Sequence, residues 1–213
     1  MDKRQPAAWF PWGDTPWARA GAAALCAAGW RVGYGTAASA PSPGPGMPLS
    51  EEAIPFDLGS GRPEDLAAAT VAAAERFGGF DGVLPWPMAP GGRKLWLDLE
   101  DRDWEQALGE VSRDLAGGLR CALPYLLGRG GAQILFLQEA APKGRPLSAP
   151  QEAARLSRFA VARALRDELG PWDVLVRVLL TPLLDEEAGR RGAAALAASG
   201  GPQAPFCFRG GSD

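Results

Sequence analysis

Short apolar runs alternate with longer amphipathic or alanine-rich stretches along most of the chain. Runs of the kind that form buried strands occur at Ala7–Phe10, Arg31–Gly35, Ala53–Leu58, Asp81–Leu84, Ile134–Leu137 and Val174–Leu180, with a candidate seventh at Phe206–Phe208. Helical stretches occur at Trp17–Ala28, Pro63–Phe77, Asp103–Leu127, Gln151–Leu169 and Asp185–Ala198. This alternation indicates βαβ units. We therefore expect a single α/β domain over residues 1–213, with a doubly wound parallel sheet of about seven strands flanked by helices.

Glycine and proline mark several of the expected element ends. Gly29 follows the first helix, Pro63 stands in the first turn of the second, and Gly170 with Pro171 ends the fourth. Residues 37–50 are rich in proline, glycine and serine and are predicted to form a flexible loop.

The absence of histidine narrows the candidate chemistry. It excludes Ser-His-Asp and Cys-His hydrolases, histidine-ligated metals and histidine acid–base catalysis. A net charge of −3 without a basic block argues against a nucleic-acid partner. The cysteines Cys26, Cys121 and Cys207 are odd in number and widely spaced, so we expect free thiols and no metal site.

No segment of the sequence predicts membrane insertion. The longest apolar run near the start, Ala20–Trp30, is too short to span a bilayer. The first residues also make a poor signal peptide, because Asp2, Asp14 and two prolines interrupt them. We therefore expect a cytoplasmic protein without a membrane partner.

Three segments resemble the short-chain dehydrogenase/reductase family. ERFGGFDGVL (residues 75–84) is similar to the family's FG-x-ID-x-LVNNAG, and DWEQALGEVSRDLAGGLRCALPYLL (residues 103–127) to DW-x3-L-x-VNL-x-G…ALP-x-L. ARALRDELGPWDVLVRV (residues 162–178) resembles RALA-x-ELGP-x-GIRVN, and the tail PFCFRGGSD resembles the family's last strand. The resemblance covers nearly the whole chain in order and implies a Rossmann-like domain of the ketoreductase or hydroxyacyl dehydrogenase type.

The family's dinucleotide-binding motif is altered in this sequence. The family binds NAD(P) through TG-x3-G-x-G after its first strand, where glycines let the backbone approach the pyrophosphate. Trp12, Pro16 and Ala18 stand at the three glycine positions, and proline lacks a backbone N–H. Thr36 ends the second strand. Asp57 stands at the position of the family's adenine-binding aspartate and is the one residue of that site that is retained. An aspartate at a strand end is, however, also common before a helix, and this is the interpretation we favour. We expect no cofactor.

The family's catalytic tetrad of Asn, Ser, Tyr and Lys is also substituted. The resemblance places Val111, Gln138, Gln151 and Arg155 at these positions, and the NNAG turn becomes residues 85–88, PWPM. Glutamine cannot replace tyrosine as a general acid. The only tyrosines, Tyr34 and Tyr125, are followed four residues later by Ala38 and Arg129, so no Tyr-x3-Lys exists. We therefore predict a pseudoenzyme.

Two further groups of residues leave alternatives open. Glu139, Glu152 and Arg155 could support an unrelated mechanism, but a surface ion pair between Glu152 and Arg155 is the interpretation we favour. The aromatic residues Trp9, Phe10, Trp12 and Trp17 could line a ligand pocket. We favour a cluster that fills the vacated cofactor cleft.

The region at residues 183–201, where the family has its substrate lid, is short in this sequence. The resemblance also implies that the chain associates with a partner through two long helices. The family dimerises through a four-helix bundle, and small residues on the second helix permit close approach. The interface residues expected from this are Leu108, Leu115, Leu119, Ala153, Leu156, Phe159, Ala160 and Arg163.

We therefore predict a non-catalytic subunit that pairs with a catalytically active relative as a heterodimer or heterotetramer, or otherwise forms a homodimer. The alternatives are a small-molecule or nucleotide sensor that uses the altered cleft, and a reductase of unusual mechanism.

Overall fold

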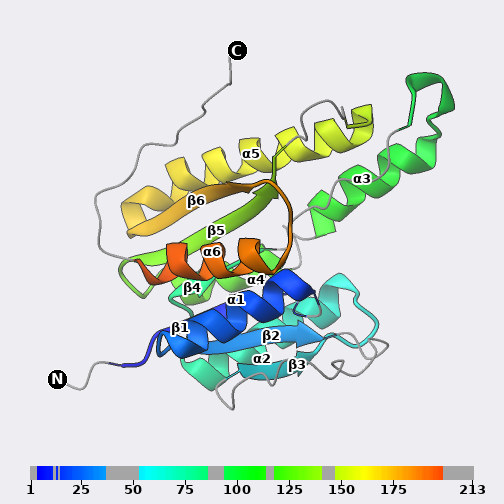
Figure 1. Cartoon of the computed structure of the whole chain (residues 1–213). Coiled ribbons are helices and arrows are strands. Elements are labelled where there is room, and N and C mark those ends of the chain that lie inside the picture. The colour runs from blue at the N-terminus through cyan, green and yellow to red at the C-terminus, as the bar shows by residue number, and fades with distance from the viewer. Residues whose placement is uncertain are drawn as a thin grey trace.

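A computed structural model describes residues 4–11, 13, 15–36, 53–85, 94–113, 118–140 and 147–198. Its sheet has six strands, all parallel, in the order β3-β2-β1-β4-β5-β6 (Figure 1). The strands are β1 (Ala7–Phe10), β2 (Arg31–Thr36), β3 (Ala53–Asp57), β4 (Gly82–Val83), β5 (Ala132–Glu139) and β6 (Val174–Thr181). The predicted doubly wound α/β domain is confirmed; the candidate strand at 206–208 lies outside the described residues.

Helices cover both faces of this sheet. They are α1 (Pro16–Ala27), α2 (Pro63–Phe77), α3 (Asp101–Arg113), α4 (Arg120–Leu126), α5 (Ala149–Leu169) and α6 (Glu186–Ala197), with short 3-10 turns at Trp96–Asp98 and Gly170–Trp172. α1 and α6 pack on one face, and α2, α4 and α5 on the other. α3 packs against α5 and extends past the end of the sheet (Figure 1).

The helix predicted over 103–127 is confirmed in its two described parts. Two helices, α3 and α4, are described there, and residues 114–117 between them lie outside the described part. α3 packs against α5, whereas α4 packs against α2. The two segments therefore lie in different packing environments. Periodicity alone did not distinguish these environments, because both segments carry apolar residues at helical spacing.

Strand alternation divides the predicted aromatic cluster between two cores. Successive strand residues point to opposite faces. Trp9 therefore packs with Phe80 and Phe56 under α2 and α4, whereas Phe10 packs with Trp17 on the α1 side, at a ring distance of 6.1 Å. A single cluster was a wrong prediction, since the sheet lies between its members; Trp12 lies outside the described residues.

Helices α1 and α6 approach each other closely at two glycines. A Cβ atom added to Gly189 would lie 1.9 Å from the carbonyl oxygen of Trp17, and one added to Gly21 would lie 3.1 Å from the carbonyl oxygen of Gly189. At the other end of α6, Gln133 Nε2 donates to the Leu196 carbonyl at 3.0 Å. The region expected to be a reduced lid thus contains a helix that lies beside α1 and is held on the sheet.

Candidate functional site

The carboxyl ends of the strands meet at one edge of the parallel sheet, and α1 and α5 begin at this edge (Figure 1). In doubly wound folds this edge is where ligands bind, between strands whose connections leave in opposite directions. The order β3-β2-β1-β4-β5-β6 places that point between β1 and β4. The residues around it are therefore the candidate functional site.

The turn between β1 and α1 is packed tightly against the end of β2. A Cβ atom at Gly13 would lie 2.3 Å from Cδ2 of Tyr34, and one at Gly35 would lie 2.2 Å from the carbonyl oxygen of Pro11. The Gly13 N–H donates to the Gly35 carbonyl at 2.7 Å. These glycines therefore serve contacts within the protein. Sequence reasoning missed Tyr34, although strand pairing brings it beside Phe10.

The first turn of α1 has few free donors for a phosphate group. Pro16 has no N–H, and the N–H of Ala18 donates to Oγ1 of the capping residue Thr15 at 3.3 Å. Helix starts bind anions through N–H groups that point away from the helix. Pro16 and the Thr15 side chain that caps the Ala18 N–H thus reduce the donors that this helix start offers.

Thr36 and Asp57 at the ends of β2 and β3 both make local contacts. Thr36 Oγ1 donates to the Phe56 carbonyl at 3.4 Å. The Asp57 carboxylate accepts the Gly59 N–H at 2.8 Å, which closes the turn before α2. The interpretation of Asp57 as an ordinary residue of a helix approach is consistent with this contact.

Polar side chains with few partners gather at the ends of β5 and β6. Gln138 is 2% exposed, and its Oε1 has no hydrogen-bond partner within the described part of the chain. The same holds for Oγ1 of Thr181, which is fully buried beside Glu139 in the strand register. Burial raises the pKa of the Glu139 carboxyl, and a hydrogen bond from the Leu184 N–H opposes this shift. The strand ends therefore hold one partly buried carboxyl group beside the buried Thr181 hydroxyl.

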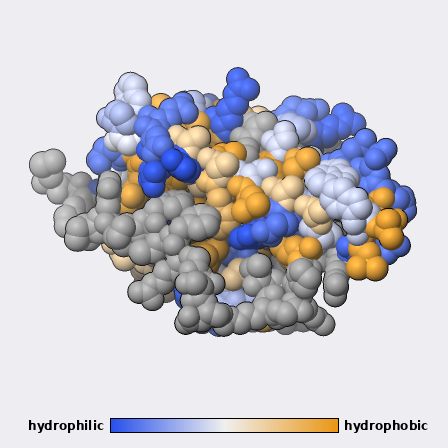
Figure 2. All heavy atoms as spheres, turned by 90° about the horizontal axis from the view of Figure 1, so that it is seen from above, coloured by the Kyte–Doolittle hydropathy of each residue, from blue (hydrophilic) through white to orange (hydrophobic). Residues whose placement is uncertain are grey.

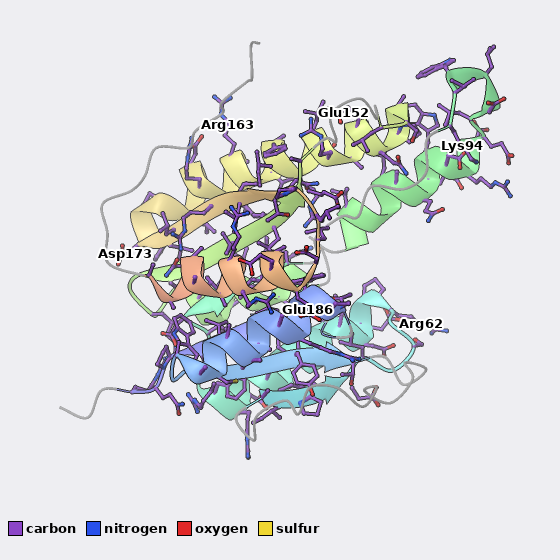
Figure 3. The ribbon with its side chains drawn as sticks, in the orientation of Figure 1. Arg62, Lys94, Glu152, Arg163, Asp173 and Glu186 are labelled. Carbon is purple, nitrogen blue, oxygen red and sulfur yellow. The ribbon has the colours of Figure 1, made fainter. Side chains whose placement is uncertain are left out.

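The residues at the tyrosine and lysine positions make contacts within the start of α5. Gln151 Oε1 accepts the Ser148 N–H at 3.4 Å. The Arg155 guanidinium binds the Glu152 carboxylate at 2.5 and 2.8 Å, which holds the pKa of that carboxyl below its ordinary value; Figure 3 labels Glu152 on this helix. Arg155 also lies over the Phe159 ring. The expected surface ion pair is thus confirmed.

Val111, at the asparagine position, is a packing residue. It is 7% exposed and forms a small apolar cluster with Ala107 and Ala154 between α3 and α5. Ala154 directly precedes Arg155, so the structure does bring these two substituted positions close together. The contact that joins them is apolar.

The expected interface residues differ in their exposure. Leu108 and Leu156 are 41% and 47% exposed, whereas Leu119 is 2% exposed and packs in the core. Placing Leu119 at an interface was therefore wrong, because this part of the chain faces the sheet. Ala160 and Arg163 are exposed, Ala153 and Phe159 are partly exposed, and Leu115 lies outside the described residues.

The described residues include neither a candidate metal site nor a candidate membrane span. No group of three or more acidic or cysteine side chains in this part of the chain is placed to hold a metal ion. No described helix is both long and apolar enough to cross a membrane.

Comparison with solved structures places the fold. A putative short-chain dehydrogenase/reductase from Sinorhizobium meliloti 1021 superposes with a TM-score of 0.72 at 17% identity, covering 92% of this chain and 91% of that one. The chain has the fold of the short-chain dehydrogenases. No family model and no curated protein matches the sequence.

Two other structures with this fold are informative. The 3-ketoacyl-(acyl-carrier-protein) reductase from Brucella melitensis, complexed with NADH, has a TM-score of 0.68 at 21% identity and covers 85% and 80% of the two chains. A short chain oxidoreductase from Pseudomonas aeruginosa PAO1 containing an atypical catalytic center has a TM-score of 0.66 at 19% identity, with 83% and 69% covered. At these identities the likeness is one of fold.

Proposed function

We propose that this chain is a non-catalytic subunit with the short-chain dehydrogenase fold, which associates with a catalytically complete relative to form a heteromeric oxidoreductase. The observation that carries the proposal is the use of Gln151 and Arg155. Their side chains form contacts at the start of α5, and neither residue type supplies the proton that a tyrosine delivers.

The packing around β1 supports the loss of ordinary NAD(P) binding. Tyr34 lies against Gly13, and the carbonyl of Pro11 against Gly35, so the backbone approach that a pyrophosphate needs is taken by the protein. Pro16 removes one donor from the helix start. We derive no reaction step through the cofactor.

Exposed apolar residues on α3 and α5 support association. Leu108 and Leu156 lie on two helices that pack against each other, and Ala160 lies one turn after Leu156. Apolar side chains exposed on neighbouring helices are typical of protein–protein contacts. This surface would bind the partner.

The test combines a binding assay with co-purification. The full chain is titrated with NADPH by calorimetry, assayed for ketone-dependent NADPH oxidation, and co-expressed with catalytically complete short-chain dehydrogenases of the same organism. We expect no saturable binding, no turnover, and co-elution with one dehydrogenase that Leu156→Asp abolishes. Leu183→Asp is the matched control, at a leucine beyond β6 that is 60% exposed, against 47% for Leu156. A stable homodimer that oxidises NADPH would overturn the proposal.

Glu139 favours a second candidate function, a reductase of unusual mechanism. Its carboxyl pKa is raised by burial, and it stands beside the buried Thr181 hydroxyl where the strands end. A carboxyl group whose pKa is raised keeps its proton to a higher pH, which favours its use as a proton donor. Turnover that Glu139→Gln abolishes would support this function, and unchanged turnover would exclude Glu139 from it.

A further inference from the structure

Arg177 of β6 is a partly buried cation on the side of the sheet that α6 covers. Burial lowers the pKa of its guanidinium, and its Nε atom is buried without a hydrogen-bond partner in the described part of the chain. Removing a cation from water costs free energy unless nearby groups compensate its charge. The groups that Arg177 contacts therefore show what it does in the fold.

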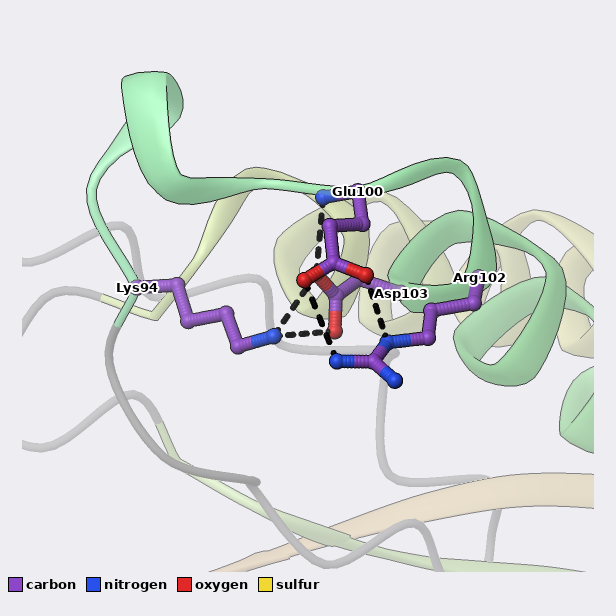
Figure 4. Close-up of polar contacts among 4 residues, drawn as sticks. All are labelled: Lys94, Glu100, Arg102 and Asp103. Atoms are coloured by element: carbon purple, nitrogen blue, oxygen red, sulfur yellow. Dashed lines mark hydrogen bonds and ion pairs between the residues drawn. The ribbon is translucent and has the colours of Figure 1, made fainter.

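Arg177 differs from the charged residues on the surface, which pair with one another. Figure 2 shows hydrophilic side chains at the surface of the molecule seen from the α5 side. In the surface cluster before α3, Lys94 Nζ donates to the Asp103 carboxylate at 2.7 and 2.9 Å, and Arg102 binds Glu100 at 2.8 Å (Figure 4). No carboxylate among the residues that the structure describes forms an ion pair with Arg177. Its charge is compensated in another way.

The partners of Arg177 lie at the C-terminal end of α6. Its Nη2 atom donates to the Ala195 carbonyl and to Oε1 of Gln133, and Nε2 of Gln133 donates to the Leu196 carbonyl at 3.0 Å. Carbonyls in the last turn of a helix lack partners within the helix and carry a partial negative charge. α6 has no basic residue of its own in that turn. Arg177 therefore supplies from β6 the cation that this helix end favours.

Close packing brings α6 onto the sheet along its length. A Cβ atom added to Gly192 would lie 3.2 Å from Cδ2 of Leu137 in β5. One added to Gly82 of β4 would lie 3.2 Å from Cδ2 of Leu196. Near the start of α6, Gly189 contacts the backbone of α1. Apolar packing is non-directional, whereas the bonds from Arg177 and Gln133 fix where the helix end lies on the strands.

We propose that Arg177 and Gln133 fix α6 on the sheet, so that this helix is a permanent wall of the fold and not a lid that opens. Lids are segments with few buried contacts, which open while the rest of a protein stays folded. α6 has instead a buried face and two hydrogen bonds from the strands to its last turn. Opening would break both bonds at once. The inference goes beyond the proposed function, since it does not depend on what the chain binds.

Native-state hydrogen exchange of the full chain, measured by NMR at rising urea concentration, tests the inference. In the wild-type chain we expect the protection factors of α6 and β5 amides to agree within about threefold, because both open only when the whole domain unfolds. Arg177→Met keeps an unbranched side chain and removes its donors. In this variant the α6 amides should become at least about tenfold less protected than those of β5, the effect of losing about one net hydrogen bond.

Arg190→Met is the matched control. Arg190 lies on the exposed side of the same helix and pairs with Glu187 and Glu186, which also belong to α6. Its loss should leave the protection factors of α6 and β5 within about threefold of each other, since exposed ion pairs contribute little. Equal loss of protection in α6 and β5 of Arg177→Met would show that Arg177 stabilises the whole fold without fixing the helix, and would overturn the inference. Wild-type α6 amides about tenfold less protected than those of β5 would overturn it as well.

Arg177→Lys keeps the inference testable if Arg177→Met does not fold. Lysine retains the charge but lacks the rigid fork of donors with which a guanidinium reaches two acceptors. We expect the α6 amides of this variant to be about threefold to tenfold less protected than those of β5. An unchanged ratio of the two protection factors would contradict the role of Arg177.

Discussion

The Gly189→Ala variant tests the close packing of α1 against α6. A Cβ atom at this position would lie 1.9 Å from the carbonyl oxygen of Trp17 and 2.9 Å from the backbone nitrogen of Gly21, whereas real Cβ atoms essentially never come within 3.0 Å of another heavy atom. Both obstacles are backbone atoms of a helix, so no side chain can rotate away. The two helices must separate by roughly 1 Å.

The expected cost follows from this separation. A gap of that size forfeits a large share of the dispersion energy along the contact, and overpacking of this kind costs about 3 kcal/mol, the upper part of its usual range. Because alanine has a higher helix propensity than glycine, the substitution also stabilises the folded state by about 1 kcal/mol. The free energy of unfolding should therefore fall by about 2 kcal/mol, or roughly 4–8 °C in Tm for a chain of this size.

The matched control is Gly109→Ala in α3, where an added Cβ meets nothing within 4 Å. This variant should gain about 0.5–1 kcal/mol from helix propensity alone. Urea unfolding followed by circular dichroism measures both values. If Gly189→Ala proved as stable as Gly109→Ala, the close approach of α1 and α6 would be refuted.

Three further variants test individual contacts. Because burial raises the pKa of Glu139 in the folded state, its destabilising charge appears as pH rises above its ordinary value of 4.5; Glu139→Gln should raise Tm at pH 7 more than at pH 4. Gln133→Ala should lower the free energy of unfolding by about 1–3 kcal/mol, since it removes a buried donor from the Leu196 carbonyl. Asp57→Ala should lower the free energy of unfolding by about 1 kcal/mol, because it removes the carboxylate that accepts the Gly59 N–H.

Each of these variants has a result that contradicts its reasoning. A Tm gain for Glu139→Gln that is independent of pH would show that charge burial is not the cause. Wild-type stability of Gln133→Ala would mean that water replaces its bond to α6. An unchanged free energy of unfolding in Asp57→Ala would show that the bond to the Gly59 N–H does not stabilise the turn.

Six strands could be predicted from the sequence because each is a short apolar run between glycine, proline or polar residues. The ends of β5 were the least accurate, since Ala132, Gln133, Gln138 and Glu139 extend the strand beyond its apolar centre. Backbone pairing with β6 keeps these residues in the strand, and Gln133 also donates to the Leu196 carbonyl of α6, which local composition does not reveal.

The candidate site was accessible to sequence reasoning only in part. The substitutions at Gln138, Gln151 and Arg155 could be located by resemblance to the family. Tyr34 could not, because the packing of its ring on Gly13 depends on how a turn and a strand end meet. The exposure of Leu95, Trp96 and Leu97 was also missed, since such an apolar run is typical of a buried segment although these side chains are exposed in the structure.

By itself the sequence determined which chemical groups exist. A chain without histidine and without Tyr-x3-Lys cannot acquire them by folding. The order of strands and helices could also be predicted from the sequence, because hydrophobic periodicity reflects the burial of each element. Only the tertiary structure decided which side of each element faces a neighbour. That choice put Leu119 in the core and brought Gly189 against Trp17, because such contacts join residues far apart in the chain.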